Sequence, residues 1–287
     1  MKAACIVVTM GNRPGELARA LDSALVQRDA DLDVILVLNG CAAPPGLPDG
    51  VHVLALPENL GPTGGRNRGA EAAAGCDLLL FLDDDAWYPD EHVAARVIDR
   101  FRKDSALGIL SLRIDDPEGR RERRQVPRLR AGDAFRSSAV TTFIEGHCAI
   151  ARAVFERAGG FPEEFFIYHE GTDLAWRAID AGFTVRYAGD IAVNHPAEPP
   201  AQRHAGVHRL KSRNRVYLAR RLLPVPFLLV YPVVWLVIDL LRARSLGGAR
   251  ALIAGTWDGI RSDAGPRRPI SWRAVWRLTR AGRPPVI

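Results

Sequence analysis

The chain has 287 residues, of which 47% are hydrophobic and 25% charged, so we expect a packed core rather than general disorder. Its net charge of +6 is unevenly distributed, because residues 201–287 contain 17 Lys and Arg against 3 Asp and Glu. The four cysteines are widely separated and form no CxxC pair, which argues against structural zinc and favours a reducing compartment.

The first two-thirds of the chain alternate predicted strands and helices. Apolar runs predict strands over residues 4–9, 34–38, 51–56, 78–82, 108–114 and 143–150. Helical spacing of apolar residues predicts helices over residues 14–26, 67–74, 90–103, 152–158 and 172–181. This order predicts an α/β fold with a Rossmann-like, mostly parallel sheet and right-handed crossovers.

Three consecutive aspartates, Asp83, Asp84 and Asp85, follow the apolar run 78–82. An all-apolar strand suits burial on both faces of a parallel sheet, and its carboxyl end lies where open α/β folds bind ligands. Adjacent negative charges repel one another unless a cation neutralises them, and Mg²⁺ and Mn²⁺ bind carboxylate oxygens and bridge to phosphates. The run therefore predicts a divalent-metal site, with an exposed acidic turn as the alternative.

A glycine-rich segment, residues 59–69, lies between a predicted strand and a predicted helix. Glycines let the backbone approach a ligand closely, and the amide groups at a helix amino terminus attract anions. Arg66 can bind two phosphate oxygens through its planar guanidinium group. The segment lacks the GxxxxGK[ST] pattern of a P-loop, so together with the aspartates it predicts half of a nucleotide-diphosphate pocket.

Several motifs occur in a characteristic order. They lie at residues 9–14, 38–40, 58–67 and 82–85, and then at 145–152, 159–166 and 168–177. Over about residues 3–220 the chain resembles the inverting family 2 glycosyltransferases of GT-A fold, most closely the rhamnosyltransferase-like members. The resemblance implies a GT-A catalytic domain over residues 1–220, followed by a helical extension over residues 221–287.

The resemblance also implies an activity. The chain would move a single sugar, with inversion, from a nucleotide-diphosphate sugar to a hydroxyl acceptor such as a lipid-linked saccharide, a glycan or a natural product. The reaction would depend on Mg²⁺ or Mn²⁺. The family often has Asp before Asn39, where this chain has Leu38. The nucleobase of the donor is therefore not fixed by the sequence, and we expect either a UDP-sugar or a dTDP-sugar.

Individual residues receive roles through the same resemblance. Thr9 and Asn39 would line the base pocket, and Asp83 would lie near the ribose or the metal. Asp85 would ligate the metal directly, and His195, beyond the acidic motif, would complete the metal site. The predicted donor-binding residues are Thr9, Asn39, Asn59, Gly61, Arg66, Asp83 and Asp84.

The catalytic base is the least regular part of the pattern. Inversion requires a carboxylate that takes the proton of the acceptor hydroxyl. The family motif commonly reads Glu-Asp-x-Asp-Leu with its second residue as base, whereas this chain has Gly171 at that place. We expect Glu170 to be the base, with Asp173 as the second candidate, although Asp173 also suits the amino terminus of the predicted helix.

Two other functions stay open from the sequence. Because Gly171 stands where the family usually has its catalytic base, the chain could be a catalytically degenerate protein that binds nucleotide sugars at the membrane surface. A sugar-phosphate nucleotidyltransferase would share a related sheet, but residues 9–13 do not supply the glycine-rich GxGxR-type loop with which those enzymes begin.

Two basic segments are candidates for contact with substrates. Arginines crowd into residues 115–137, which we interpret as a solvated loop or as a loop that meets an anionic acceptor. Residues 196–209 resemble the family's loop that closes on the donor. Residues that it would bring toward the diphosphate are His204, His208, Lys211, Arg213 and Asn214.

The carboxyl-terminal region combines apolar and basic residues. Residues 222–238 carry no charge, but the run is shorter than the roughly 20 residues of a spanning helix and contains three prolines. Trp272 and Trp276 lie four residues apart among arginines, which is typical of helices at a membrane interface. We expect a cytoplasmic protein in peripheral contact with the anionic inner face of the cell membrane, with a single span as the alternative and no nucleic-acid partner.

Overall fold

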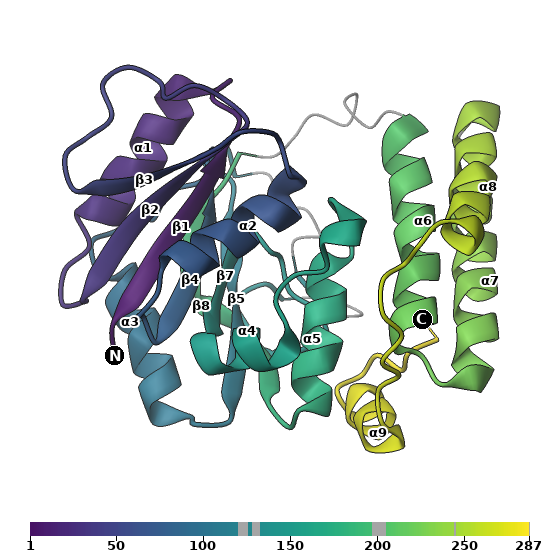
Figure 1. The fold of residues 1–287 in the computed structure, drawn as a ribbon. Helices are drawn as coiled ribbons and strands as arrows, with labels where there is room; N and C mark the ends of the chain where they lie inside the picture. Colours follow the sequence, from purple (N-terminus) through teal and green to yellow (C-terminus); the bar gives the residue numbers. More distant parts are fainter. Residues whose placement is uncertain (120–125, 128–132, 197–204, 244, 287) are drawn as a thin grey trace.

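The computed structural model describes residues 1–119, 126–127, 133–196, 205–243 and 245–286. Within them, one mixed sheet has the strand order β3-β2-β1-β4-β7-β5-β8-β6, in which β6 and β7 run antiparallel to their neighbours (Figure 1). The strands are β1 (Ala3–Thr9), β2 (Leu32–Asn39), β3 (Val51–Leu56), β4 (Leu78–Asp83), β5 (Leu107–Asp115), β6 (Ser138–Ala139), β7 (His147–Ala151) and β8 (Thr184–Asn194). The predicted α/β fold with a mostly parallel sheet is confirmed.

Helices cover both faces of the sheet. On one face lie α1 (Pro14–Leu25) and α3 (Val93–Lys103), whose buried side chains share one core cluster. The other face is covered by α2 (Gly61–Ala72), α4 (Arg152–Ala158) and α5 (Glu170–Asp180). Central strands therefore bury both faces, as in β4, where Leu79 and Phe81 face one cluster while Leu78, Leu80 and Leu82 face the other.

Four helices follow the sheet and stand beside it (Figure 1). They are α6 (Ala205–Leu222), α7 (Val225–Arg242), α8 (Leu246–Arg261) and α9 (Trp272–Arg280). The core cluster on the α5 face continues into them through Tyr217, Tyr231 and Leu278. The predicted division at residue 220 falls within α6, so a single helix joins the two predicted units, and the division stays a prediction.

The glycine-rich segment differs from its expected conformation. We predicted a turn that leads into a helix over residues 67–74, whereas α2 already begins at Gly61. Its glycines allow α2 to lie against the sheet, because a Cβ atom at Gly65 would lie 2.6 Å from Val8 Cγ1. The helix amino terminus lies at the carboxyl edge of the sheet, bonded to Asn39 at the end of β2.

Two other elements were not anticipated. β8 was not predicted as a strand, although it carries Asn194 to the edge where the ligand site was expected. The strand predicted over residues 143–150 is shorter and later, and it pairs antiparallel with β4, which places His147 opposite Leu82. The arginines at 120–125 and 128–132, and His204, lie outside the described residues.

Candidate active site

A cavity of about 410 Å³ opens at the carboxyl ends of β1 and β4. In an open α/β sheet this edge is where ligands bind, because the loops that follow neighbouring strands converge there. The cavity brings together most of the residues that the sequence predicted for the site. The predicted residues that line it are Thr9, Asn39, Arg66, Asp83, Asp84, Asp85, Glu170 and His195.

Each of the three aspartates has a different partner. Arg66 Nη2 donates to Asp83 Oδ1 over 2.9 Å, and Thr9 Oγ1 donates to Asp84 Oδ2 over 2.6 Å. Asp85 is paired with Arg13 through one carboxylate oxygen and with His195 through the other. Burial and the charges of the two neighbouring aspartates raise the pKa of Asp84 above its ordinary value. Cationic groups thus pair with Asp83 and Asp85 and a hydroxyl group with Asp84, and none of the three aspartates is fully exposed.

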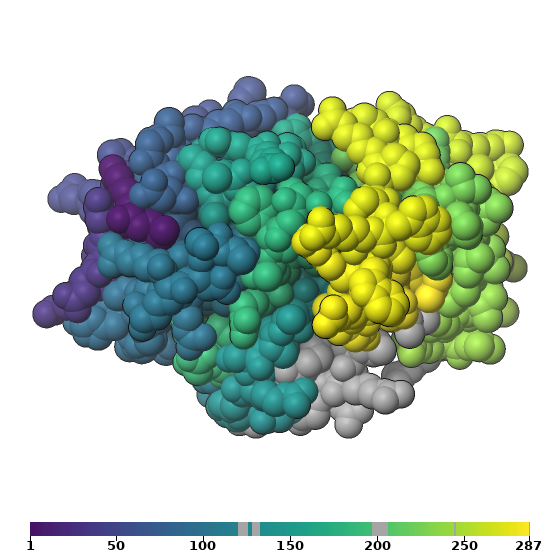
Figure 2. Space-filling model, turned by 90° about the horizontal axis from the view of Figure 1, so that it is seen from below, coloured from purple at the N-terminus to yellow at the C-terminus, as the bar shows by residue number. Residues whose placement is uncertain are grey.

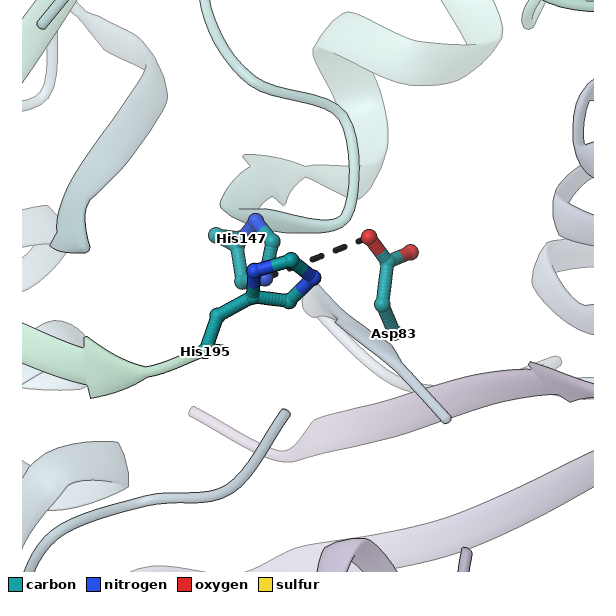
Figure 3. A group of neighbouring side chains, drawn as sticks. All are labelled: Asp83, His147 and His195. Carbon is teal, nitrogen blue, oxygen red and sulfur yellow. Dashed lines mark ion pairs between the residues drawn. The ribbon is translucent and has the colours of Figure 1, made fainter. Parts of the chain in front are cut away.

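Two imidazoles and one carboxylate form a group that can hold a metal ion. One ligand atom from each of Asp83, His147 and His195 lies within 4.8 Å of the others (Figure 3). His195 Nε2 also lies 3.2 Å from Asp85 Oδ1, so a second carboxylate adjoins the group. Carboxylate oxygens suit Mg²⁺ and Mn²⁺, and neutral imidazoles suit divalent transition ions in general.

His147 supports this reading by its own surroundings. Its side chain is buried, and neither ring nitrogen has a hydrogen-bond partner among the described residues. Burial lowers the pKa of His147 to about 4, so its ring is neutral and retains a lone pair. Burial of an imidazole without a hydrogen bond is unfavourable, and a cation bound to its free nitrogen would compensate for the missing partner.

His147 was missing from the predicted metal ligands, which were Asp85 and His195. Its place in the site depends on the antiparallel pairing of β7 with β4, because that pairing brings the first residue of β7 to the end of the acidic strand. The sequence contains the residue in a motif but no local signal for this pairing.

Two predicted donor-binding residues, Asn59 and Gly61, do not line the cavity but are bonded to Asn39, which does. Asn39 Nδ2 donates to Asn59 Oδ1 and to the carbonyl of Gly61, each over 3.0 Å, and Asn39 Oδ1 accepts from the Leu60 amide. Asn59 Oδ1 in turn accepts from the Gly61 amide over 2.8 Å. These bonds fix the start of α2, where Gly61 has a φ of +70°.

Two glutamates, Glu145 and Glu170, line the same cavity as the aspartates, and Arg66 lies between Asp83 and Glu170. Glu170 is buried, with Oε1 3.6 Å from Arg66 Nη1 and no hydrogen-bond partner for Oε2 among the described residues. Glu145 Oε1 accepts from the Gly171 amide over 2.8 Å. Burial raises the pKa of Glu170 to about 8, and the neighbouring Glu145 carboxylate pushes it in the same direction, against the attraction of Arg66.

The raised pKa of Glu170 predicts a pH dependence of stability. Between its ordinary value of 4.5 and about 8, the folded chain holds a proton on Glu170 that the unfolded chain has released. This contribution to stability is therefore present below pH 4.5 and is lost as the pH rises toward 8. Relative to the parent, Glu170→Gln should gain free energy of unfolding from pH 5 to pH 8, measured by urea denaturation. A difference that is constant over this range would contradict the assignment.

Asp173, the second predicted base, lies away from the cavity. It is fully buried, and its oxygens accept from Arg177 Nε over 2.6 Å and from Arg221 Nε over 3.0 Å. The Arg177 pair lies within α5 and the Arg221 pair joins α5 to α6, so the geometry gives Asp173 a place in the packing of the helices. Its catalytic role stays a prediction that the described contacts do not favour.

The residues of α6 that were expected near the diphosphate contact a loop instead. Asn214 is fully buried and donates to the carbonyls of Phe165, Ile167 and Tyr168 over 2.7 to 3.0 Å. Arg213 also donates to the carbonyl of Phe165. Phe166, Tyr168 and His169 all have positive φ, so this loop is held in a conformation that such residues rarely adopt. The loop leads directly into Glu170.

A larger hollow of about 920 Å³ lies elsewhere, between α2, α4 and the end of α6. Three of the arginines that line it, Arg152, Arg177 and Arg221, are already bound to carbonyl or carboxylate oxygens. We place the candidate active site in the smaller cavity, because the acidic and imidazole groups converge there.

Comparison with known families shows to which family the chain belongs. A model described as glycosyl transferase family 2 matches residues 5–159, more than half of the chain. The chain belongs to this family. The match ends before Glu170 and His195, so it covers the acidic run and His147 but leaves the rest of the cavity outside. A search of curated proteins finds no match to this family 2 glycosyltransferase.

Solved structures agree on the fold. A structure of GalNAc-T7 with UDP, GalNAc and Mn²⁺ superposes with a TM-score of 0.63 at 13% identity, over 82% of this chain and 51% of that one. A mannosyltransferase from Pyrobaculum calidifontis in complex with GDP-Man and Mn²⁺ gives 0.58 at 16%, over 91% and 87%. S. aureus TarS residues 1–349 with UDP-GlcNAc give 0.63 at 15%, over 97% and 84%.

The family model confirms the predicted family, and the solved structures agree with the GT-A fold. Membership of a glycosyltransferase family supports a sugar-transferring enzyme. The glycosyltransferase spans about half the length of the first of these structures. Its assignment to the rhamnosyltransferase-like branch stays a prediction, as do the roles of its individual site residues.

Proposed function

We propose that this enzyme transfers one sugar, with inversion, from a UDP- or dTDP-sugar to a hydroxyl acceptor, with Mg²⁺ or Mn²⁺ bound at the acidic run. The observation that carries the proposal is the convergence of three aspartates, His195 and two arginines in one cavity at the carboxyl edge of the sheet, with His147 beside Asp83 and His195. This mixture of charges suits a diphosphate held beside a divalent cation.

Different residues of the cavity would bind the cation, the diphosphate and the nucleobase and accept the proton. Asp83, Asp85, His147 and His195 would hold the cation, which when bound neutralises charge on the leaving diphosphate. Arg13 and Arg66, which neutralise the aspartates in this structure, lie where they can bind phosphate oxygens instead. Thr9 and Asn39 would line the pocket for the nucleobase of the donor. A cavity carboxylate on the Glu170 side would take the acceptor proton.

A panel of donors tests the proposal directly. The purified chain is incubated with UDP-, dTDP- and GDP-sugars in the presence of Mn²⁺, Mg²⁺ or EDTA, and released nucleoside diphosphate is measured. We expect release from one donor, lost with EDTA and restored by Mn²⁺. Binding of donors without release would instead favour the degenerate protein, and pyrophosphate-dependent turnover the nucleotidyltransferase.

We also propose that the carboxyl-terminal helices place this enzyme on an anionic membrane at the cytoplasmic side. Among the described residues, α7 is the helix long and apolar enough to span a membrane. One side of it packs against α5 and α6. There Tyr231 contacts Trp176 of α5 edge to face, and Asp239 pairs with Arg215 of α6. The opposite side exposes Val225, Leu229, Val233, Val237 and Leu241, each four residues after the last.

This arrangement supports a helix that lies along the membrane rather than across it. Further exposed apolar side chains on α8 and α9 are Leu246, Ile253, Trp257, Ile260, Trp272 and Trp276. These residues belong to the carboxyl-terminal part of the chain, which forms one end of the molecule (Figure 2). Arg242, Arg250, Arg261 and Arg273 lie in the same helices or beside them and match the charge of anionic lipid.

Substitution of the exposed side of α7 tests membrane contact. The double variant Leu229→Ser, Val233→Ser should bind vesicles of phosphatidylglycerol at least about tenfold more weakly, because loss of these apolar groups from lipid removes more than about 1.4 kcal/mol. Flotation measures the bound fraction, and Val53→Ser, at an exposed site on β3, is the control. Equal binding by parent and double variant would contradict the proposal, and resistance to alkaline carbonate would indicate a span.

A further inference from the structure

The described part of the cavity contains five carboxylates, and they fall into two groups. Asp83, Asp84 and Asp85 form the acidic run, with Arg66, Thr9 and Arg13 as their partners. Glu145 and Glu170 line the same cavity from other elements. An inverting transfer needs a base apart from the groups that bind the leaving diphosphate, and with the acidic run assigned to the cation the two glutamates are the candidates.

Accessibility separates the two glutamates. The Glu170 side chain is 3% exposed and faces Arg66, which leaves an acceptor hydroxyl little access to its oxygens. Glu145 is partly exposed and lies in the loop before β7. A base must come within about 2.6–3.2 Å of the proton-bearing oxygen, and of the two glutamates Glu145 is the less buried residue.

The position of Glu145 is tied to the absence of a side chain at residue 171. A Cβ atom on Gly171 would lie 2.7 Å from both Cγ and Cδ of Glu145. The Glu145 carboxylate therefore occupies the space into which a side chain at residue 171 would point. The Gly171 amide, in the first turn of α5, donates to Glu145 Oε1 over 2.8 Å and holds the carboxylate in that space.

We infer that Glu145 is the catalytic base of this enzyme, and that its carboxylate takes the place of the missing side chain at residue 171. The inference rests on the proposed inverting transfer. As the acceptor oxygen forms its bond to the anomeric carbon, its proton passes to Glu145. The bond between that carbon and the diphosphate oxygen breaks, and its electron pair leaves with the diphosphate. Glu170 stays behind Arg66 as a positioning residue.

Removal of the carboxylate tests the inference. Glu145→Gln should lower kcat for transfer by a factor of about 100 to 10,000, the usual range for a general base. Its Kd for UDP with Mn²⁺ should stay within about threefold of the parent, because the acidic run is untouched. Glu156→Gln, at an exposed site on α4, is the control for loss of a surface carboxylate.

Restoration of the carboxylate separates a base from a structural group. In the variant Glu145→Ala, added formate should recover at least about tenfold in transfer, and so should the second substitution Gly171→Asp, which returns a carboxylate to the same space. Transfer by Glu145→Gln at more than half the parental kcat would overturn the inference. So would failure of both formate and the second substitution Gly171→Asp to restore transfer in Glu145→Ala. A parent without transfer from any donor would overturn the proposed function as well.

Discussion

Replacement of Asp85 by asparagine is expected to lower sugar transfer by about three orders of magnitude. Asp85 lies between Arg13 and His195, and its charge would help to hold the cation against the diphosphate. Asparagine keeps the shape but removes the charge, and a loss of about 4 kcal/mol of transition-state stabilisation corresponds to this factor. The measurement is release of nucleoside diphosphate at saturating donor over a range of Mn²⁺ concentrations.

A surface carboxylate close in sequence provides the control for Asp85. Asp90 pairs with Arg96 at an exposed site beyond the acidic run. We expect Asp90→Asn to transfer sugar within about twofold of the parent, because exposed ion pairs contribute little. If Asp85→Asn showed the parental rate and the parental response to Mn²⁺, Asp85 would have no part in the metal site.

Replacement of Asp173 by asparagine is expected to lower the free energy of unfolding and to leave kcat for transfer largely unchanged. Asp173 is fully buried and accepts from Arg177 and Arg221, so the variant would leave two guanidinium groups without their shared anion. Removal of one partner from a buried ion pair costs about 3–5 kcal/mol. Urea denaturation should show a loss of this size in the free energy of unfolding.

The same variant decides whether Asp173 is a base. The folded fraction, assayed at low temperature, should keep most of its kcat, because the carboxylate does not line the cavity. Asp99→Asn, which breaks an exposed pair with Lys103, should change stability by less than about 1 kcal/mol. Full stability of Asp173→Asn combined with loss of transfer would restore Asp173 as the base.

The parts of the fold that local patterns encode were predictable. The apolar run that became β4 ends in Asp83, and the order of strands and helices predicted the parallel half of the sheet. The extent of α2 was not predictable, because its glycines were interpreted as a turn. They are better explained by the close approach of the helix to Val8, which is a tertiary contact.

The candidate site was predictable where its residues follow parallel strands. Thr9, Asn39 and Asp83 end or nearly end β1, β2 and β4, so the topology alone brings them to one edge. His147 and Glu145 reach that edge through the antiparallel strand β7, and the sequence shows no local sign of that pairing. The link between Glu145 and Gly171 spans 26 residues and is visible only in the folded chain.

Binding of Mn²⁺ in the presence of UDP tests the account most directly. Electron paramagnetic resonance of the parent should show bound Mn²⁺ with nitrogen coupling from imidazole ligands. The double variant Asp83→Asn, His195→Ala should lose this signal, whereas His92→Ala, at an exposed site, should keep it. A parent that binds no Mn²⁺ with UDP, or a double variant with the parental signal, would contradict the claim that this edge of the sheet holds a divalent cation.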